Sequence, residues 1–293
     1  MNLLSTVKRA LRRLAHSPAT PVTAVLDPGL QLEVAREFER LRLLVRQSMP
    51  ENPAGWGFKV YSQADEDGII ESICRRIGLD AGTFIEIGCG DGRENNSHYL
   101  LLKGWRGIWV DGNAQNIAAI RAALPPTDRL RVVEAMVTPD NVVELVTPLP
   151  GGTSSLDLLS VDVDSVDLQI ARSAVKALRP KVLIGEYNAK FPYPLAISVE
   201  EATPARWSGD DYQGASLAAW VETFESDYAL VSCNLAGTNA FFVRRDCASG
   251  LFGNHSPTAL YQPSRFFLAT LKSGHPPSLS FLAKRLREDR AGV

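Results

Sequence analysis

Short apolar runs alternate with helical patterns from Thr83 onward, and this alternation constrains the fold more than any other feature. Runs such as DLLSVDV and KVLIGEY are apolar at nearly every position, as is typical of strands that are covered on both faces. The pattern predicts an α/β fold with a doubly wound, mostly parallel sheet. The expected strands are 83–87, 107–111, 130–134, 157–163, 181–187, 228–233 and 239–244, and the expected helices are 95–103, 114–124, 140–146, 166–178 and 215–226.

The last two expected strands are separated by little more than the residues LAGT. This link is too short for a crossover helix, so the two strands should form an antiparallel hairpin at one edge of the sheet. Parallel βα units that end in such a hairpin are the arrangement of the Rossmann-like class I methyltransferases, whereas a dinucleotide dehydrogenase would end in a parallel strand. The sequence thus favours a seven-stranded, methyltransferase-like sheet.

The chain of 293 residues divides into three expected parts. Residues 1–57 form a helical N-terminal extension, 58–246 the sheet domain, and 247–293 a helical tail. Apolar residues make up 45% of the chain, which is enough to fill a core, and the net charge of −2 gives no bulk attraction to nucleic acid. We therefore expect a small-molecule or glycan partner and no nucleic acid.

The four scattered cysteines form no CxxC pair, which is typical of free thiols in a reducing cytoplasm. No apolar run approaches the roughly 18 to 20 residues that cross a bilayer. Residues 1–16 carry four basic residues, no acid, and leucines at helical spacing. This helix could lie on an anionic membrane surface, or it could pack on the domain or on a second subunit. The expectation is a cytoplasmic homo-oligomer, with peripheral contact at the inner membrane face under the first interpretation.

The stretch IEIGCGDG predicts a ligand-binding turn after the first strand. Glu86 ends that strand, and Gly88, Gly90 and Gly92 follow at alternate positions. Glycine allows the backbone to approach a ligand closely, and a carboxylate can accept hydrogen bonds from its amine or hydroxyl groups. A plain strand-to-helix turn is the alternative.

The second strand strengthens this interpretation because GIWVDGN places Asp111 and Gly112 at its end. An acid at this position can bind the two hydroxyls of a ribose. The neighbouring Asp91 disfavours a pyrophosphate, so an adenosine-like ligand without phosphates, S-adenosylmethionine, is preferred. Glu134 ends the third strand and should lie near the adenine, unless it is simply a solvated acid.

Acids and an amide follow the fourth and fifth strands. Asp162 and Asp164 lie two apart in SVDVDSVD, and Glu186 and Asn188 lie in IGEYNAKF. If the strand persists, Asp162 and Asp164 point the same way, and adjacent strands bring all four groups together at the carboxyl edge. The cluster could hold Mg²⁺ or another divalent cation, or one carboxylate could act as a general base. Asp164 and Asp167 could also merely cap a helix.

Two further features have simple alternatives. His98 follows the glycine loop closely enough to face the cleft, although packing within its helix is the simpler interpretation. The stretch between Ala189 and Ser216 shows no periodicity, and long irregular loops are often functional. It contains Trp207, Asp210, Asp211 and Tyr212, a composition that suits sugar binding and also an ordinary surface loop.

The segments YSQADEDGII, TFIEIGCGDGRENNSHYLLLKGWRGIWVDGN, LLSVDVDSVD and VLIGEYN together resemble the FkbM-type branch of the S-adenosylmethionine-dependent methyltransferases, from about Tyr61 to Asp246. The resemblance implies methyl transfer to a hydroxyl of a sugar or natural product. It points to Glu86, Gly88 and Asp111 for the cofactor, with Ser62, Gln63 and Asp67 closing over its methionine end. Many relatives have DVEG where this chain has DVDS at 162–165, so the identity of the base stays open.

The sequence therefore predicts an S-adenosylmethionine-dependent O-methyltransferase. The alternatives are a non-catalytic scaffold of the same fold in a glycan-synthesis complex and, more weakly, an oxidoreductase. The candidate catalytic residues are Asp162, Asp164 and Asn188, the candidate metal ligands are Asp162 and Glu186, and the candidate cofactor residues are Gln63, Asp67, Glu86, Gly88, Gly90, Asp111, Gly112 and Glu134.

Overall fold

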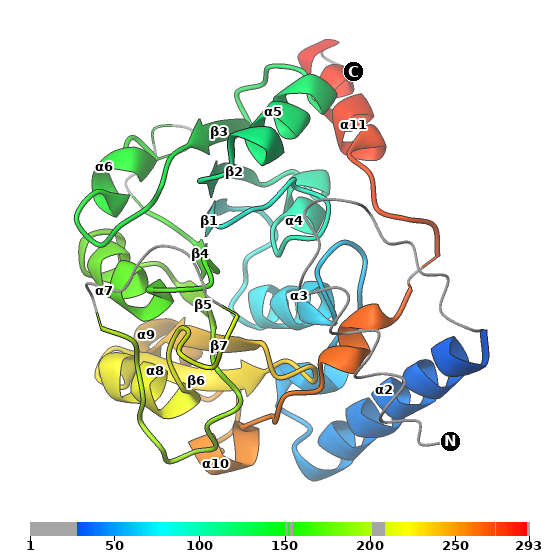
Figure 1. The fold of residues 1–293 in the computed structure, drawn as a ribbon, viewed down its shortest axis with the longest axis vertical. Helices are drawn as coiled ribbons and strands as arrows, with labels where there is room; N and C mark the ends of the chain where they lie inside the picture. Colours follow the sequence, from blue (N-terminus) through cyan, green and yellow to red (C-terminus); the bar gives the residue numbers. More distant parts are fainter. Residues whose placement is uncertain (1–27, 150–151, 153–154, 201–208, 273, 292–293) are drawn as a thin grey trace.

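The computed structural model describes residues 28–149, 152, 155–200, 209–272 and 274–291 (Figure 1). The expected helix over 1–16 and Trp207 lie outside these residues. Among the described helices, none combines the length and the apolar character that crossing a bilayer requires.

Seven strands form one sheet in the order β3-β2-β1-β4-β5-β7-β6. Strands β1 to β5 run parallel, while β7 pairs antiparallel with both β5 and β6. The predicted α/β fold with a terminal antiparallel hairpin is confirmed, and its topology is that of the class I methyltransferase fold. The strands are β1 (Thr83–Ile87), β2 (Arg106–Asp111), β3 (Leu130–Glu134), β4 (Leu158–Val161), β5 (Val182–Glu186), β6 (Tyr228–Cys233) and β7 (Asn239–Arg244).

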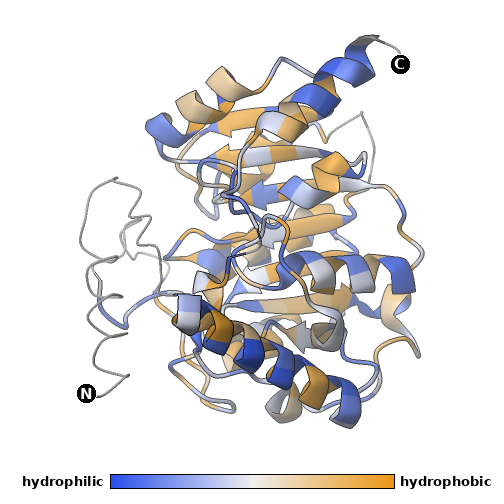
Figure 2. Cartoon of the chain, turned by 90° about the vertical axis from the view of Figure 1, so that its right-hand side faces the viewer, coloured by the Kyte–Doolittle hydropathy of each residue, from blue (hydrophilic) through white to orange (hydrophobic). Residues whose placement is uncertain are grey.

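Alternate strand residues enter two separate hydrophobic clusters, one on each face of the sheet. Phe84 and Trp109 belong to the first cluster, and Ile85 and Ile108 belong to the second. All four are buried, because a strand between two helical layers turns successive side chains to opposite apolar faces. Figure 2 shows the apolar strands inside and hydrophilic segments along the outer surfaces of the helices.

Helices cover both faces of the sheet (Figure 1). The first cluster takes residues from α2 (Pro28–Ser48), α3 (Glu66–Arg76), α4 (His98–Leu102), α5 (Ala114–Ala123) and α11 (Ser280–Ala291). The second takes residues from α6 (Val142–Val146), α7 (Asp167–Leu178) and α8 (Leu217–Phe224). The remaining elements are short: η1 (Pro53–Trp56), α9 (Arg245–Ala248), α10 (Pro257–Leu260) and η3 (Phe266–Thr270).

The helix α2 precedes all strands of the sheet in the sequence and α11 follows them, yet both helices pack into the first hydrophobic cluster. Val34 and Leu41 of α2 are buried there, as are Leu282 and Leu286 of α11. The described parts of the N-terminal extension and of the C-terminal tail therefore pack onto the same face of the sheet.

Candidate functional site

The loop after β1 turns sharply at three glycines. Gly88, Gly90 and Gly92 have φ angles of +86°, +55° and +77°, a region that strains any residue with a Cβ. A Cβ on Gly88 would overlap the carbonyl oxygen of Asp162, whereas a Cβ on Gly90 would meet nothing within 4 Å. The loop is thus packed against the end of β4 at Gly88 and open at Gly90.

Asp111, at the end of β2, fixes the open part of this loop. Its Oδ2 accepts a hydrogen bond from the Gly90 N–H over 2.8 Å. Its Oδ1 accepts from the Asn113 N–H over 2.8 Å and from Asn116 Nδ2 over 3.3 Å. An ionised carboxylate offers about four acceptor positions, so this half-buried side chain retains capacity toward a ligand.

Glu86 anchors the segment that leads into α4. Its carboxylate is buried and accepts from the N–H groups of Asn96 (2.7 Å) and Ser97 (3.0 Å) and from the Ser97 hydroxyl. Burial raises the pKa of Glu86 to about 7, although these three donors oppose the increase. Glu86 therefore positions the segment before α4, and its expected cofactor contact stays a prediction.

Asp67 has a similar role in the loop before α3. Its Oδ2 accepts from the N–H groups of Val60, Tyr61 and Ser62 over 2.6, 2.7 and 2.9 Å. The side chain is 1% exposed, and burial raises its pKa to about 6. Of the residues expected at the methionine end, Ser62 and Asp67 are buried, and only Gln63 exposes its side chain.

His98 links these two loops as a packed, neutral ring. Its Nδ1 lies 2.9 Å from the Gly92 carbonyl oxygen, and its ring stacks on Tyr61 with centroids 3.6 Å apart. Burial lowers the pKa of His98 to about 4, so the imidazole is uncharged at neutral pH. This geometry agrees with the simpler interpretation, in which His98 is a packing residue.

The carboxyl ends of β4 and β5 bring three acids together. Carboxylate oxygens of Asp162, Asp167 and Glu186 lie within 4.8 Å of one another. Burial together with the neighbouring acids raises the pKa values of Asp162 and Glu186 well above the usual range. Raised pKa values in two adjacent carboxyls favour a form in which the pair shares a proton.

Asp167 belongs to the cluster but also holds the turn before α7. Its Oδ1 accepts from the Val163 N–H over 2.6 Å and its Oδ2 from the Ser165 N–H over 3.0 Å. Burial raises its pKa to about 6. The sequence interpretation gave it only a capping role and missed its place in the cluster, although Asp162, Asp164 and Asp167 are close in sequence.

Asp164 does not join this cluster, which corrects the expected geometry. The strand ends at Val161, and Asp164 adopts a left-handed conformation with φ of +59°. Its exposed carboxylate accepts from Gln213 Nε2 over 3.1 Å. Because the alternation of a strand is lost after Val161, Asp162 and Asp164 do not act as a same-face pair.

Asn188 anchors the following loop, and its expected role as a catalytic hydrogen bonder stays a prediction. Its Nδ2 donates to the carbonyl oxygens of Asp211 (3.2 Å) and Gln213 (3.0 Å), and its Oδ1 accepts from the Lys190 N–H (3.1 Å). Both amide protons and the amide oxygen are thus engaged within the protein. The amide holds the two ends of the 190–213 segment together.

Glu134 and Gly112 flank Asp111 at the edge of the sheet. Glu134 pairs with Asp111 in the β2–β3 register, is exposed, and lies 3.6 Å from Arg121 in an ion pair. Gly112 is exposed, and a Cβ on it would meet the sulfur of Met136. Both residues therefore lie where the second and third strands end, as predicted.

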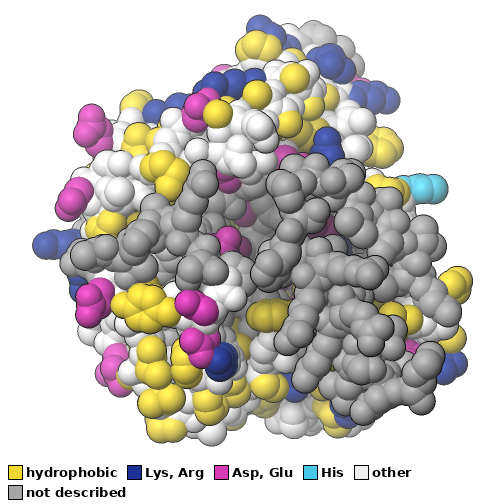
Figure 3. Space-filling view, in the orientation of Figure 1, with side chains coloured by type: hydrophobic (Ala, Val, Ile, Leu, Met, Phe, Trp, Pro, Cys, Tyr) yellow, Lys and Arg dark blue, Asp and Glu magenta, His cyan; other side chains and the backbone are white. Residues whose placement is uncertain are grey.

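The carboxyl edge of the sheet faces a hollow in the surface. In Figure 3, drawn in the orientation of Figure 1, acidic side chains are visible deep in the middle of the face. Two cavities border the described parts of the 190–214 segment, one of about 80 Å³ beside Phe191 and Tyr212 and one of about 370 Å³ beside Ser198. Tyr212 is exposed, and its hydroxyl accepts from the Glu200 N–H over 3.2 Å.

No family model and no curated protein matches this chain. Among solved structures, a candidate caffeoyl-CoA O-methyltransferase from Staphylococcus aureus is 12% identical with a TM-score of 0.43, covering 83% of this chain and 100% of that chain. An S-adenosylmethionine-bound amino pentose methyltransferase from Micromonospora echinaspora is 16% identical with a TM-score of 0.39, covering 62% and 92%. A TehB-like methyltransferase from Corynebacterium glutamicum is 14% identical with a TM-score of 0.36, covering 75% and 100%.

Proposed function

We propose that this protein is an S-adenosylmethionine-dependent O-methyltransferase of the FkbM type that acts on a hydroxyl of a sugar, a glycan or a natural product. One observation carries the proposal. Gly88 packs without a Cβ against the carbonyl of Asp162, so the glycine loop and the carboxyl pair meet at the ends of β1 and β4. The strand order reverses between these strands, and open α/β sheets bind ligands at such a point.

The loop amides favour a cofactor without phosphates. The N–H groups of Gly88 and Cys89 donate to the Val110 carbonyl oxygen, Gly90 donates to Asp111, and Gly92 donates to the Cys89 carbonyl oxygen. A pyrophosphate site needs free backbone N–H groups, and here these amides are engaged. An adenosyl group with a charged methionine end fits this loop better than a dinucleotide.

Asp111, Gly112 and Glu134 are the residues proposed to hold the adenosyl part, with the open side of Gly90 facing it. Gln63 is proposed for the methionine end, since its side chain is exposed at the neighbouring loop. S-adenosylmethionine supplies an electrophilic methyl group on a sulfonium. The protein's own residues must then bring an acceptor oxygen into line with that methyl and take its proton.

Asp162 is the proposed base, with Glu186 as its partner. In this proposal the two carboxyls, whose pKa values are both raised by burial and by their mutual repulsion, share one proton, so one of them is an ionised acceptor while the other is a hydrogen-bond donor. A half-buried carboxylate with a raised pKa takes a proton from a hydroxyl more readily than one with an ordinary pKa would. In this role Asp162 receives the hydroxyl proton as the oxygen attacks the methyl group.

A divalent cation is a second candidate occupant of the same cluster, favoured by the three carboxylate oxygens within 4.8 Å. Both oxygens of Asp167 accept backbone hydrogen bonds, so Asp162 and Glu186 are the two side chains available to bind a cation in exchange for their proton. Oxygen ligands of this kind suit Mg²⁺ or Mn²⁺.

The test uses radiolabelled S-adenosylmethionine and an extract of host glycans and small molecules. We expect the wild-type protein to transfer label, and Asp162→Asn to lose at least about 100-fold in rate, in line with general-base catalysis. The variant should still bind S-adenosylhomocysteine. Cofactor binding without any transfer would instead favour a non-catalytic scaffold, and nicotinamide binding would favour an oxidoreductase.

A further inference from the structure

Two loops border the place where the methionine end of the cofactor is proposed to lie. The first leads from Phe58 to the start of α3 and contains Gln63, and the second runs from the glycine turn through Glu94 to α4. The stack of Tyr61 on His98 joins them, with ring centroids 3.6 Å apart. A side chain that reaches between these loops is therefore close to both walls of the proposed site.

Lys59 places its ammonium group between the two loops. Its Nζ donates to the Gln63 carbonyl oxygen over 2.9 Å and forms an ion pair with Glu94 Oε1 over 3.4 Å. The Lys59 side chain is only 11% exposed. The backbone beside it is also fixed, because the Val60 N–H donates to the buried carboxylate of Asp67. The protein thus holds this ammonium in a defined position.

The ammonium of Lys59 keeps capacity for a further acceptor. An ammonium has three N–H donors, and the contacts with Gln63 and Glu94 account for two of them. The contact with Glu94 is also long, since charged N–H···O bonds are usually roughly 2.7 to 2.9 Å. Both contacts lie at the exposed surface, so an anionic group can approach the ammonium from solvent.

The charges of the two loops favour Lys59 as the partner of such a group. Residues 58–67 contain three acids and one cation, Lys59, and residues 88–97 contain two acids and one cation, Arg93. Arg93 is 55% exposed and pairs within its own loop with Asp91 over 3.5 Å. Lys59 is therefore the cation that these loops hold beside Gln63, where an amino-acid carboxylate has to be neutralised.

We propose that Lys59 binds the carboxylate at the methionine end of the cofactor, with its third N–H donating to a carboxylate oxygen. This inference rests on the proposed function, which supplies S-adenosylmethionine as the cofactor. A hydrogen bond between an ammonium and a carboxylate is about twice as strong as one between neutral groups. Glu94 then has the opposite effect on affinity, because its carboxylate competes with the cofactor for the same ammonium.

The test compares S-adenosylhomocysteine with 5′-methylthioadenosine, which keeps the thioadenosine and lacks the amino-acid group. Lys59→Met should weaken binding of S-adenosylhomocysteine by about tenfold, as expected for the loss of a charged hydrogen bond. It should leave binding of 5′-methylthioadenosine unchanged, and Lys59→Arg should restore most of the lost affinity because it keeps the charge. Titration calorimetry gives the affinities, and thermal unfolding shows that each variant is folded.

Glu94→Gln separates ligand binding from a purely structural role of the Lys59–Glu94 ion pair. If Lys59 binds the cofactor, this variant should bind S-adenosylhomocysteine about two- to fivefold more tightly, because the competing carboxylate is gone. If the ion pair only holds the loops together, Glu94→Gln should weaken binding as Lys59→Met does, and that result would overturn the inference.

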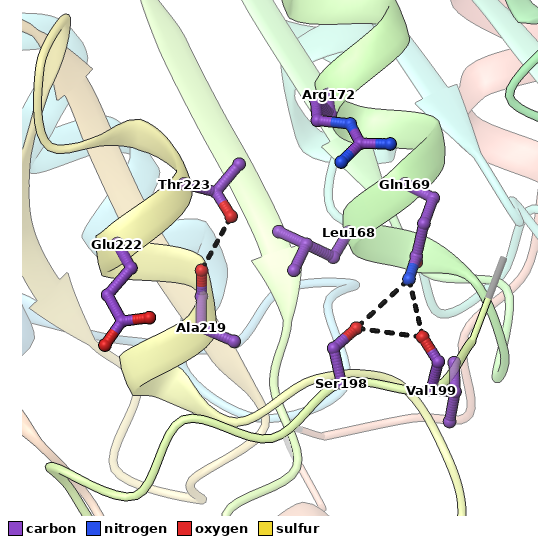
Figure 4. Close-up of a pocket in the computed structure, with 8 residues that line it drawn as sticks. All are labelled: Leu168, Gln169, Arg172, Ser198, Val199, Ala219, Glu222 and Thr223. Atoms are coloured by element: carbon purple, nitrogen blue, oxygen red, sulfur yellow. Dashed lines mark hydrogen bonds between the residues drawn. The ribbon is translucent and has the colours of Figure 1, made fainter.

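Arg93→Met and Arg172→Met are the matched controls, because each removes one positive charge. Arg93 lies in the second loop, whereas Arg172 lies on α7 beside the cavity of about 370 Å³ in Figure 4, on the opposite face of the sheet from α3 and α4. Both variants should bind S-adenosylhomocysteine as the wild type does.

Three results would overturn the inference and leave the proposed function standing. They are an unchanged affinity of Lys59→Met for S-adenosylhomocysteine, an equal loss of 5′-methylthioadenosine binding in that variant, and a larger loss in Arg93→Met. Failure of the wild-type protein to bind either ligand would instead refute the proposed cofactor site, and this inference with it.

Discussion

The carboxylate of Asp111 and the N–H of Gly90 are joined by a hydrogen bond of 2.8 Å across the ends of β2 and β1. A Cβ on Gly90 would meet no atom within 4 Å, whereas a Cβ on Gly88 or Gly92 would overlap neighbouring atoms. The bond therefore holds the exposed part of the loop at a fixed distance from the acid that is proposed to bind the ribose. Cofactor affinity should depend on both residues for this reason.

Asp111→Ala should weaken binding of S-adenosylhomocysteine by about 10- to 100-fold. Hydrogen bonds to a charged group contribute about 1.5 to 3 kcal/mol, and each 1.4 kcal/mol is tenfold in affinity. Titration calorimetry measures the change. Asp128→Ala is the matched control, because Asp128 is exposed and pairs only at the surface with Arg106. Equal affinity in Asp111→Ala and the wild type would contradict the cofactor site.

Gly88→Ala should destabilise the protein far more than Gly90→Ala. Both residues have positive φ, which costs alanine about 1 to 2 kcal/mol. Only at Gly88 would the added Cβ also overlap backbone, the carbonyl of Asp162. Thermal unfolding should show a fall of several degrees for Gly90→Ala and a larger fall, or loss of folded protein, for Gly88→Ala. Similar melting temperatures for the two variants would show that this contact is not tight.

The strands were predictable because their apolar runs report burial on both faces, and the hairpin because its link is short. Neighbouring strands also made the meeting of Asp162 and Glu186 predictable, since β4 and β5 pair in parallel. Asp162 comes directly after the last residue of β4, and Glu186 is the last residue of β5. Local pattern and topology were sufficient for these features.

Other site residues depend on contacts that no local pattern encodes. Asp164 adopts a left-handed conformation that removes its side chain from the cluster. The sequence around Asp164 has a strand-like pattern, which does not indicate this conformation. Glu86 bonds to residues ten and eleven positions later, and Asn188 to residues more than twenty positions later. Their amides and carboxylates were expected to face a ligand, whereas the folded chain uses them to hold its own loops.

Metal titration tests whether a divalent cation binds the carboxyl cluster of Asp162 and Glu186. If a cation occupies the cluster, Mn²⁺ or Mg²⁺ should bind the wild-type protein with release of about one proton, because it displaces the proton shared by Asp162 and Glu186. Calorimetry in buffers of different ionisation enthalpy counts that proton. Glu186→Gln should lose the metal binding, whereas Asp164→Asn, which lies outside the cluster, should keep it. Full methyl transfer after treatment with a chelator would exclude a required metal.

Stability should fall as the pH rises from about 4.5 to 7, and Glu86 should contribute to this fall. Its pKa is raised to about 7 in the folded protein, against 4.5 as the usual value. In this interval the folded state keeps a proton that the unfolded chain has lost, so raising the pH favours unfolding, by a few kcal/mol at most. His98 acts in the opposite direction, since its pKa is lowered to about 4 and the unfolded chain gains a proton below about 6.5.

A comparison of the wild type with Glu86→Gln isolates this contribution, because His98 and Asp67 are common to both proteins. The wild type should lose more thermal stability between pH 5 and pH 8 than the variant does, since glutamine cannot ionise in the buried site. Differential scanning calorimetry at several pH values gives the two slopes. Parallel slopes would mean that Glu86 ionises in the folded protein as readily as in the unfolded chain. In that case the three hydrogen bonds to its carboxylate would fully offset the cost of burying the charge.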